Sequence, residues 1–139
     1  MGKYIAEQTI KRMIRRGSAV RGARVNVLGL SFKENCGDLR NSKVVDVIHE
    51  LQSYGVEVQV ADPWVTAEEA HTEHGIALQT LSALQPAQAL VVAVAHREFK
   101  EAGFAGLSRL LERGGVLMDV KAVLDPQPWR DRGDHVWRL

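Results

Sequence analysis

The sequence predicts a doubly wound α/β domain, with a parallel sheet of five to six strands and helices on both of its faces. Two observations carry this prediction. Short apolar segments of strand length alternate along the chain with segments whose apolar residues recur every three or four positions. Glycines or an Asp-Pro pair end several of these segments, as is typical where a buried strand or helix passes into a loop.

The composition fits one globular domain and excludes several functional classes. The chain has 139 residues, of which 45% are hydrophobic and 25% are charged. No apolar run is long enough to cross a membrane, and Glu7 lies where a secretion signal would be apolar, so we expect a cytoplasmic protein without a membrane partner. The net charge of +1 argues against nucleic acid as a partner. Cys36 is the only cysteine, which excludes an internal disulfide and a multi-cysteine metal cage.

The first predicted element is a helix over residues 1–16, preceding the sheet. Its apolar residues form one face, and two arginines followed by Gly17 are typical of a helix end. No capping residue precedes it, which indicates the end of a longer helix in a larger protein. We therefore divide the chain into a helical segment, 1–20, and an α/β domain, 21–139. Because a minimal domain offers this helix no partner face, we expect it to mediate self-association.

A β-loop-α-β unit follows the helix. A strand is predicted over residues 24–28, and Ser42 fits the N-cap of a helix over residues 43–54. Gly55 ends that helix, and a second strand runs over residues 56–61. The right-handed crossover rule makes these two strands parallel.

The second half of the chain continues the alternation. Further strands are predicted over residues 76–78, 89–95, 116–120 and 135–139. Helices are predicted over residues 66–74, 81–84 and 104–112, the last of them ended by Gly114-Gly115. The apolar run at 89–95 is typical of a central parallel strand, whereas the last strand fits a sheet edge. This succession indicates a Rossmann-like fold.

The turn after the first strand decides whether the domain can hold a dinucleotide by itself. A Rossmann domain that does so carries G-x-G-x-x-G at this point. Residues 29–34 read Gly-Leu-Ser-Phe-Lys-Glu, so only the first glycine is present. Phe32 and Lys33 stand where bare backbone would have to approach a pyrophosphate. The turn therefore argues against a self-sufficient NAD-binding domain.

The same loop concentrates groups that suit a nucleotide. It leaves the carboxyl end of a strand, where open α/β sheets bind their ligands. Phe32, Lys33 and Arg40 would offer a ring and two cations to a base or sugar beside phosphates. In the alternative interpretation, Asp38 and Arg40 form an ordinary surface pair and Ser42 only caps the helix. The residues by themselves leave both interpretations open.

Several fixed spacings match one known family. They are a G-x-x-F-K pattern at 29–33, a D-x-R-x-S pattern at 38–42, Gly55, and the pair Asp62-Pro63. Together they resemble the C-terminal, UDP-binding domain of the UDP-glucose/GDP-mannose dehydrogenases over nearly the whole chain, and the first helix resembles the end of that family's central dimerisation helix. The segments 94–99 and 116–121 resemble the branch that oxidises UDP-N-acetylhexosamines for surface polysaccharides.

The resemblance implies which residues contact the substrate. Phe32 and Lys33 would contact the UDP-sugar. Lys121 lies where family members often carry an arginine that contacts ligand, and a lysine cannot reproduce the bidentate contact of an arginine. Asp119 would orient the loop of Lys121 rather than react.

The resemblance also implies a contact to the cofactor. Arg40 would reach NAD bound on another domain, across a cleft between the two domains. Asp38 would orient the guanidinium of Arg40, and Ser42 would support the loop as the cap of the following helix.

What the sequence lacks matters equally. The family's catalytic thiol lies in a Gly-Gly-x-Cys-x-Pro-Lys-Asp segment that is missing here, and Cys36 has no histidine near it in sequence, which is typical of an unreactive loop cysteine. The parent enzyme, a homodimer or higher oligomer, would oxidise the sugar alcohol to an aldehyde and then to a carboxylate with NAD. This chain alone is expected to be inactive.

Other candidate residues point less clearly. His71 and His74 lie three apart on a predicted helix, but no third ligand is indicated and no metal site is expected. His96 either touches a ligand or is a hydrogen-bonded strand-end histidine, and Trp64 fits a packing lid.

Two further functions stay open. A non-enzymatic Rossmann-like regulatory or oligomerisation module would explain the missing glycines but not the loop motifs, and the turn disfavours a free-standing NAD-binding oxidoreductase.

Overall fold

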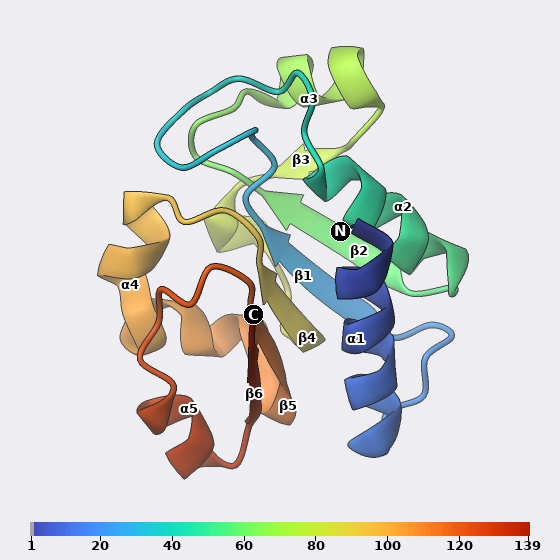
Figure 1. Ribbon diagram of the computed structural model, residues 1–139, viewed down its shortest axis with the longest axis vertical. Coiled ribbons are helices and arrows are strands. Elements are labelled where there is room, and N and C mark those ends of the chain that lie inside the picture. Colours follow the sequence, from blue (N-terminus) through green and yellow to red (C-terminus); the bar gives the residue numbers. More distant parts are fainter. Residues whose placement is uncertain (1) are drawn as a thin grey trace.

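A computed structural model of the protein describes residues 2–139. Its sheet has six strands, all paired in parallel, in the order β3-β2-β1-β4-β5-β6. The strands are β1 (Arg24–Leu28), β2 (Glu57–Ala61), β3 (Leu78–Gln79), β4 (Ala87–Val92), β5 (Leu111–Asp119) and β6 (His135–Arg138). This order confirms the Rossmann-like, doubly wound sheet, with β6 at one edge (Figure 1).

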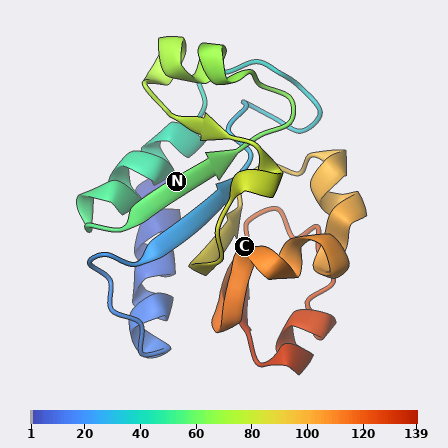
Figure 2. The same ribbon diagram turned by 180° about the vertical axis from the view of Figure 1, so that it is seen from behind.

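Helices cover both faces of the sheet, as Figures 1 and 2 show from opposite sides. They are α1 (Gly2–Arg15), α2 (Val44–Ser53), α3 (Ala67–His74), α4 (Arg97–Leu107) and α5 (Gln127–Arg132), with 3₁₀ turns η1 (Leu81–Ala83) and η2 (Ser108–Leu110). Side chains of α1 and α2 bury one face of the strands, and those of α4 and α5 bury the other. The central strands β1 and β4, between these two cores, are accordingly almost wholly buried.

Helix α1 has a partner face after all. Its stripe of Ile5, Ile10 and Met13 is buried in the same core as α2 and the central strands. Beyond its end, the guanidinium of Arg16 donates to the carbonyl of Gly114, at 3.0 Å, and to that of Gly133. The expectation of an unpartnered helix is therefore wrong, because α1 packs beside α2 over β4 and β5. The division of the chain at residue 20 stays a prediction.

Two helical regions differ from the sequence analysis. The helix expected at 104–112 begins at Arg97 and ends at Leu107, with a kink at Gly103, where φ is 53°. Gly114 and Gly115 then lie inside β5 rather than at a helix end. Helix α5, between Pro126 and Gly133, was not expected. In the described part of the chain, no helix is long and apolar enough to span a membrane.

The order of the strands places a crevice at one edge of the sheet. Strands β1 and β4 are neighbours, but the chain leaves β1 towards α2 on one face and leaves β4 towards α4 on the other. The loops that follow these strands therefore diverge, and such a switch point is where open α/β sheets bind ligands. Short backbone bonds keep the two loop starts on the sheet: Gly29 N donates to Ala61 O at 2.8 Å, and Ala93 N to Leu28 O at 2.9 Å.

Candidate functional site at the carboxyl edge of the sheet

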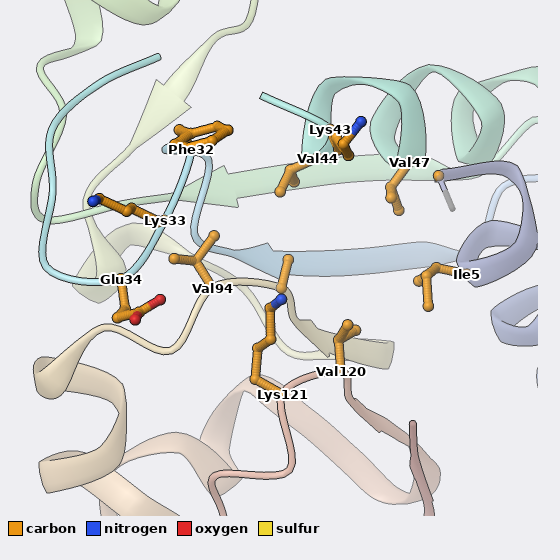
Figure 3. A pocket seen from close by; sticks show the side chains of 12 residues that line it. Ile5, Phe32, Lys33, Glu34, Lys43, Val44, Val47, Val94, Val120 and Lys121 are labelled. Carbon is orange, nitrogen blue, oxygen red and sulfur yellow. The ribbon is translucent and has the colours of Figure 1, made fainter. Parts of the chain in front are cut away.

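A cavity of about 280 Å³ lies at this switch point. Its lining comes from the loops after β1, β4 and β5 and from the first turns of α1 and α2 (Figure 3). The lining residues are Gly2, Ile5, Phe32, Lys33, Glu34, Lys43, Val44, Val47, Ala93, Val94, Val120 and Lys121. The site therefore unites segments that are distant in the sequence.

The cavity combines an apolar wall with a cationic rim. Valines of α2 and of the β4 and β5 loops form the wall, and the ring of Phe32 stands at its edge, 52% exposed. The charged lining residues are three lysines, Lys33, Lys43 and Lys121, and a carboxylate, Glu34. In Figure 3 the ammonium of Lys121 points in among the lining side chains, whereas that of Lys33 points outward. The arrangement suits an anion that also carries a flat or apolar part.

The structure brings together three residues that the sequence analysis assigned to the substrate. Phe32, Lys33 and Lys121 all line the one cavity. Glu34 and Lys43 were not assigned to a site, although both line it. Their charge near a strand end or helix start was the available signal, but nothing local told them from surface residues.

Asp62, at the end of β2, holds the start of the β1 loop. Its Oδ2 accepts the backbone N–H of Leu30 at 2.7 Å and of Ser31 at 2.9 Å, and its Oδ1 accepts that of Trp64 at 2.8 Å. Burial favours a higher pKa, but a hydrogen bond from His96 and these three backbone bonds outweigh it and lower the pKa of Asp62. Asp62 thus remains an anion inside the fold.

This carboxylate decides what the turn can bind. The backbone amides of Leu30 and Ser31 are those that a dinucleotide turn would present to a pyrophosphate, and Asp62 already occupies both. Gly29 is needed for another reason: its φ is 97°, and a Cβ there would lie 2.6 Å from Cβ of Val94. The turn does not fit the phosphates of NAD, in agreement with the sequence analysis.

His96 is a buried, hydrogen-bonded residue. It is absent from the cavity lining, and its ring contacts Asp62, Ser31 and Asn35. Trp64 stacks near the ring, with centroids 6.0 Å apart, and its indole N–H donates to Glu98 at 2.9 Å. Of the two interpretations of His96, the structure thus favours the hydrogen-bonded one.

Asp119 shapes the loop that carries Lys121. Its side chain is fully buried at the end of β5, and it accepts the N–H of Val123 at 3.1 Å and of Leu124 at 2.8 Å. The loop turns tightly there, with Ala122 at a φ of 55°. This geometry directs Lys121 towards the cavity.

Arg40 lies apart from the cavity. Its guanidinium forms a bidentate pair with the carboxylate of Asp38, with both contacts at 3.1 Å, and its side chain is 79% exposed. The hydrogen bond from Arg40 lowers the pKa of Asp38. Both residues line an open groove against α3, where Glu69 and Glu73 lie opposite. Asp38 therefore orients Arg40 on a surface outside the cavity lining.

Ser42 does not cap α2. The N-cap is Lys43, without a side-chain cap, and the hydroxyl of Ser42 donates instead to the carbonyl of Leu30 at 2.5 Å. The cap assignment was wrong because Leu30 is buried, so its carbonyl needs a donor inside the fold, and the hydroxyl of Ser42 supplies it. Ser42 nevertheless ties the end of the loop to its beginning.

The remaining candidates take no part in the cavity. Cys36 is half-buried in the loop. Among residues 2–139, no group of three or more His, Cys, Asp or Glu side chains could hold a metal ion. His74 contacts the carbonyl of Leu39 through Nε2, at 2.8 Å.

The family model described as "UDP-glucose/GDP-mannose dehydrogenase family, UDP binding domain" matches residues 26–126, which contain the loops after β1, β4 and β5. The chain belongs to this family. It corresponds to the family's UDP-binding domain, as the motifs of the loop predicted.

Two curated relatives show which members of the family the chain is similar to. The chain is 46% identical over 125 residues to a UDP-N-acetyl-D-glucosamine 6-dehydrogenase of Pseudomonas aeruginosa, covering 90% of the chain and 30% of the relative. It is 43% identical over 124 residues to the enzyme of the same name from Salmonella typhi, covering 89% of the chain and 29% of the relative. The chain thus spans about 30% of the length of the curated relatives it matches.

Solved structures agree on the fold. An NDP-N-acetyl-D-galactosaminuronic acid dehydrogenase from Methanosarcina mazei superposes with a TM-score of 0.86 at 20% identity, over 99% of the chain and 28% of that protein. The UDP-N-acetyl-mannosamine dehydrogenase Cap5O from Staphylococcus aureus superposes with a TM-score of 0.71 at 22% identity, over 99% of the chain and 30% of that protein.

Proposed function

We propose that the chain binds the UDP moiety of a UDP-sugar in the cavity at the switch point, as one domain of an NAD-dependent nucleotide-sugar 6-dehydrogenase. The observation that carries this proposal is the lysine rim around an apolar cavity, since Lys33, Lys43 and Lys121 all lie within the residues that match the family's UDP-binding domain. The names of the curated relatives support a UDP-N-acetylhexosamine as the sugar.

The chemistry of UDP matches the two parts of the cavity. A diphosphate needs cations, and the ammonium of Lys121, which points into the cavity, and that of Lys33, at the rim, would supply them. The uracil and ribose need a flat or apolar surface, which Phe32 and the valine wall supply. The sugar would then project from the cavity towards the rest of the enzyme.

In the whole enzyme, the C6 alcohol of the sugar would become an aldehyde and then a carboxylate. NAD would accept one hydride in each oxidation, and water would supply the second carboxylate oxygen. We assign none of this redox chemistry to residues of this chain, whose part is to bind and orient the nucleotide. Arg40, outside the cavity, is the residue that we assign to NAD held by another domain.

The localisation and oligomeric state of the whole enzyme are proposed as the sequence predicts them. We propose a cytoplasmic enzyme for polysaccharide biosynthesis that acts as a homodimer or higher oligomer. The exposed side chains of Tyr4 and Ile14 leave part of α1 available for a second subunit.

Titration calorimetry of this chain with UDP, a UDP-N-acetylhexosamine and NAD, each alone, tests the proposal. We expect binding of UDP and of the UDP-sugar and none of NAD. Binding of NAD alone would indicate a free-standing oxidoreductase, and binding of none of the three would indicate a regulatory or oligomerisation module. The chain mixed with UDP-sugar and NAD should also form no NADH above background.

A further inference from the structure

The imidazole of His96 joins two loops at the carboxyl edge. The residue precedes α4, and none of its side chain is exposed. Its Nδ1 accepts the backbone N–H of Asn35 at 2.9 Å. Its Nε2 lies 3.0 Å from Oδ2 of Asp62 and 3.0 Å from Oγ of Ser31. Both ring nitrogens are therefore engaged.

These contacts determine where the ring carries its proton. A backbone amide can only donate, so Nδ1 must offer a lone pair to Asn35. The carboxylate of Asp62 already accepts two backbone N–H groups on Oδ2, so Nε2 must donate to it. The hydroxyl of Ser31 donates to the carbonyl of Lys33 at 3.2 Å, which leaves its oxygen free to face Nε2–H. The ring is consequently neutral, with its hydrogen on Nε2.

The two contacts flank the part of the loop that lines the cavity. Ser31 precedes residues 32–34 and Asn35 follows them, so one ring holds both ends of a three-residue segment. Asn35 adopts a φ of 53°, and its side-chain oxygen accepts the N–H of Arg97 at 2.9 Å. The side chains of Phe32, Lys33 and Glu34 are themselves exposed. Their placement therefore depends on the anchored ends.

We propose that His96 is a positioning residue that sets the 32–34 segment for ligand binding through the acceptor at Nδ1. It touches no ligand, and it acts through Asn35 and Ser31. The part of the proposal that concerns UDP rests on the proposed function. The part that concerns the ring and the segment stands on the free chain.

Nuclear magnetic resonance of the ligand-free chain tests the ring directly. Long-range proton–nitrogen spectra distinguish a protonated from an unprotonated imidazole nitrogen. At neutral pH we expect an unprotonated Nδ1 and a protonated Nε2 for His96. A proton on Nδ1, or on both nitrogens, would overturn the proposal whether or not UDP binds.

Two substitutions of His96 distinguish the roles of its two ring nitrogens. His96→Asn places an amide oxygen near the position of Nδ1 and can keep the bond to Asn35, whereas His96→Gln places its amide near Nε2 and can keep the bond to Asp62. We expect the Kd for UDP to stay within about threefold in His96→Asn and to rise roughly tenfold or more in His96→Gln, as for the loss of one buried hydrogen bond. His49→Asn and His49→Gln, at an exposed position of α2, serve as matched controls and should leave the Kd unchanged.

The outcomes separate this inference from the proposed function. If both His96 variants lose UDP equally, or neither does, the acceptor at Nδ1 is not what positions the segment. If the wild-type chain binds no UDP, the proposed function fails, and backbone relaxation of residues 32–34 replaces the Kd. His96→Gln should then mobilise this segment and His96→Asn should not, while equal mobility in both variants would refute the inference. Should either variant fail to fold, the protonation state of the wild-type ring decides.

Discussion

The two halves of the loop after β1 are held in opposite ways. In residues 30–35, the buried side chains of Asp62, just after β2, and His96, just before α4, bind the backbone, and residues 32–34 line the cavity. In residues 36–41, the charged pair of Asp38 and Arg40 is bound to itself, and it faces an open groove. One loop thus contains a segment that is fixed within the fold, residues 32–34, and an exposed cation, Arg40.

The two halves therefore differ in where their binding partners lie. The first half is complete within this chain, because Asp62 and His96 fix it before any ligand arrives. The second half offers Arg40 to a partner outside the chain, since Asp38 orients the guanidinium without burying it. A ligand for the first half should bind the isolated chain, whereas a ligand for the second half needs the rest of the enzyme.

The largest contrast is expected in stability. Asp62→Ala removes the acceptor of three backbone amides and of His96, so the free energy of unfolding should fall by about 3–5 kcal/mol. Asp38→Ala, on the exposed half, should leave the urea midpoint unchanged. Urea unfolding followed by circular dichroism measures both variants. Equal losses in the two variants would show that the halves do not differ in anchoring.

Binding should show the next largest contrast. Lys33→Ala should weaken UDP binding to the chain about tenfold or more, because a charged contact to phosphate is worth roughly 1.5–3 kcal/mol. Lys11→Ala, an exposed lysine on α1 outside the cavity lining, is the matched control and should not change the Kd. An unaltered Kd in Lys33→Ala by calorimetry would remove Lys33 from the site.

Acid should weaken the anchored half in a defined direction. The folded-state pKa of Asp62 is lowered, so its stabilising effect is fully present above its unfolded pKa, about 3.9, and is lost as the pH falls through the lower folded value. The difference in unfolding free energy between the wild type and Asp62→Asn should therefore be constant at neutral pH and shrink below about pH 4. A difference that grows on acidification would contradict the assignment of Asp62 as a buried anion.

The smallest effect is expected at Arg40 in the isolated chain. Arg40→Ala should change the Kd for UDP by less than about twofold, because an exposed ion pair contributes little to the fold around it. In the full-length enzyme the same change should raise the KM for NAD more than that for the UDP-sugar. Loss of UDP binding by the isolated variant would make Arg40 a substrate residue instead.

The sequence predicted the strands better than the interactions between their loops. Buried β-branched runs marked β1, β2 and β4. The start of α4 was missed because Phe99 is the one buried residue in the part of this helix before Gly103, and a single apolar residue gives no helical repeat. The loop motif correctly pointed to Phe32 and Lys33, which both line the cavity. They could not reveal the bond between Asp62 and His96, because those residues are 34 positions apart and no local pattern records a buried tertiary hydrogen bond.

Gly2 sets the width of the cavity at its far end. A Cβ on this residue would lie 2.6 Å from Cβ of Asp46, so a side chain there would force α1 and α2 apart. Ile5 on the one helix and Val47 on the other form facing parts of the cavity lining. The missing side chain therefore keeps the two helices close, and even an alanine at this position would push them apart and widen the space between Ile5 and Val47.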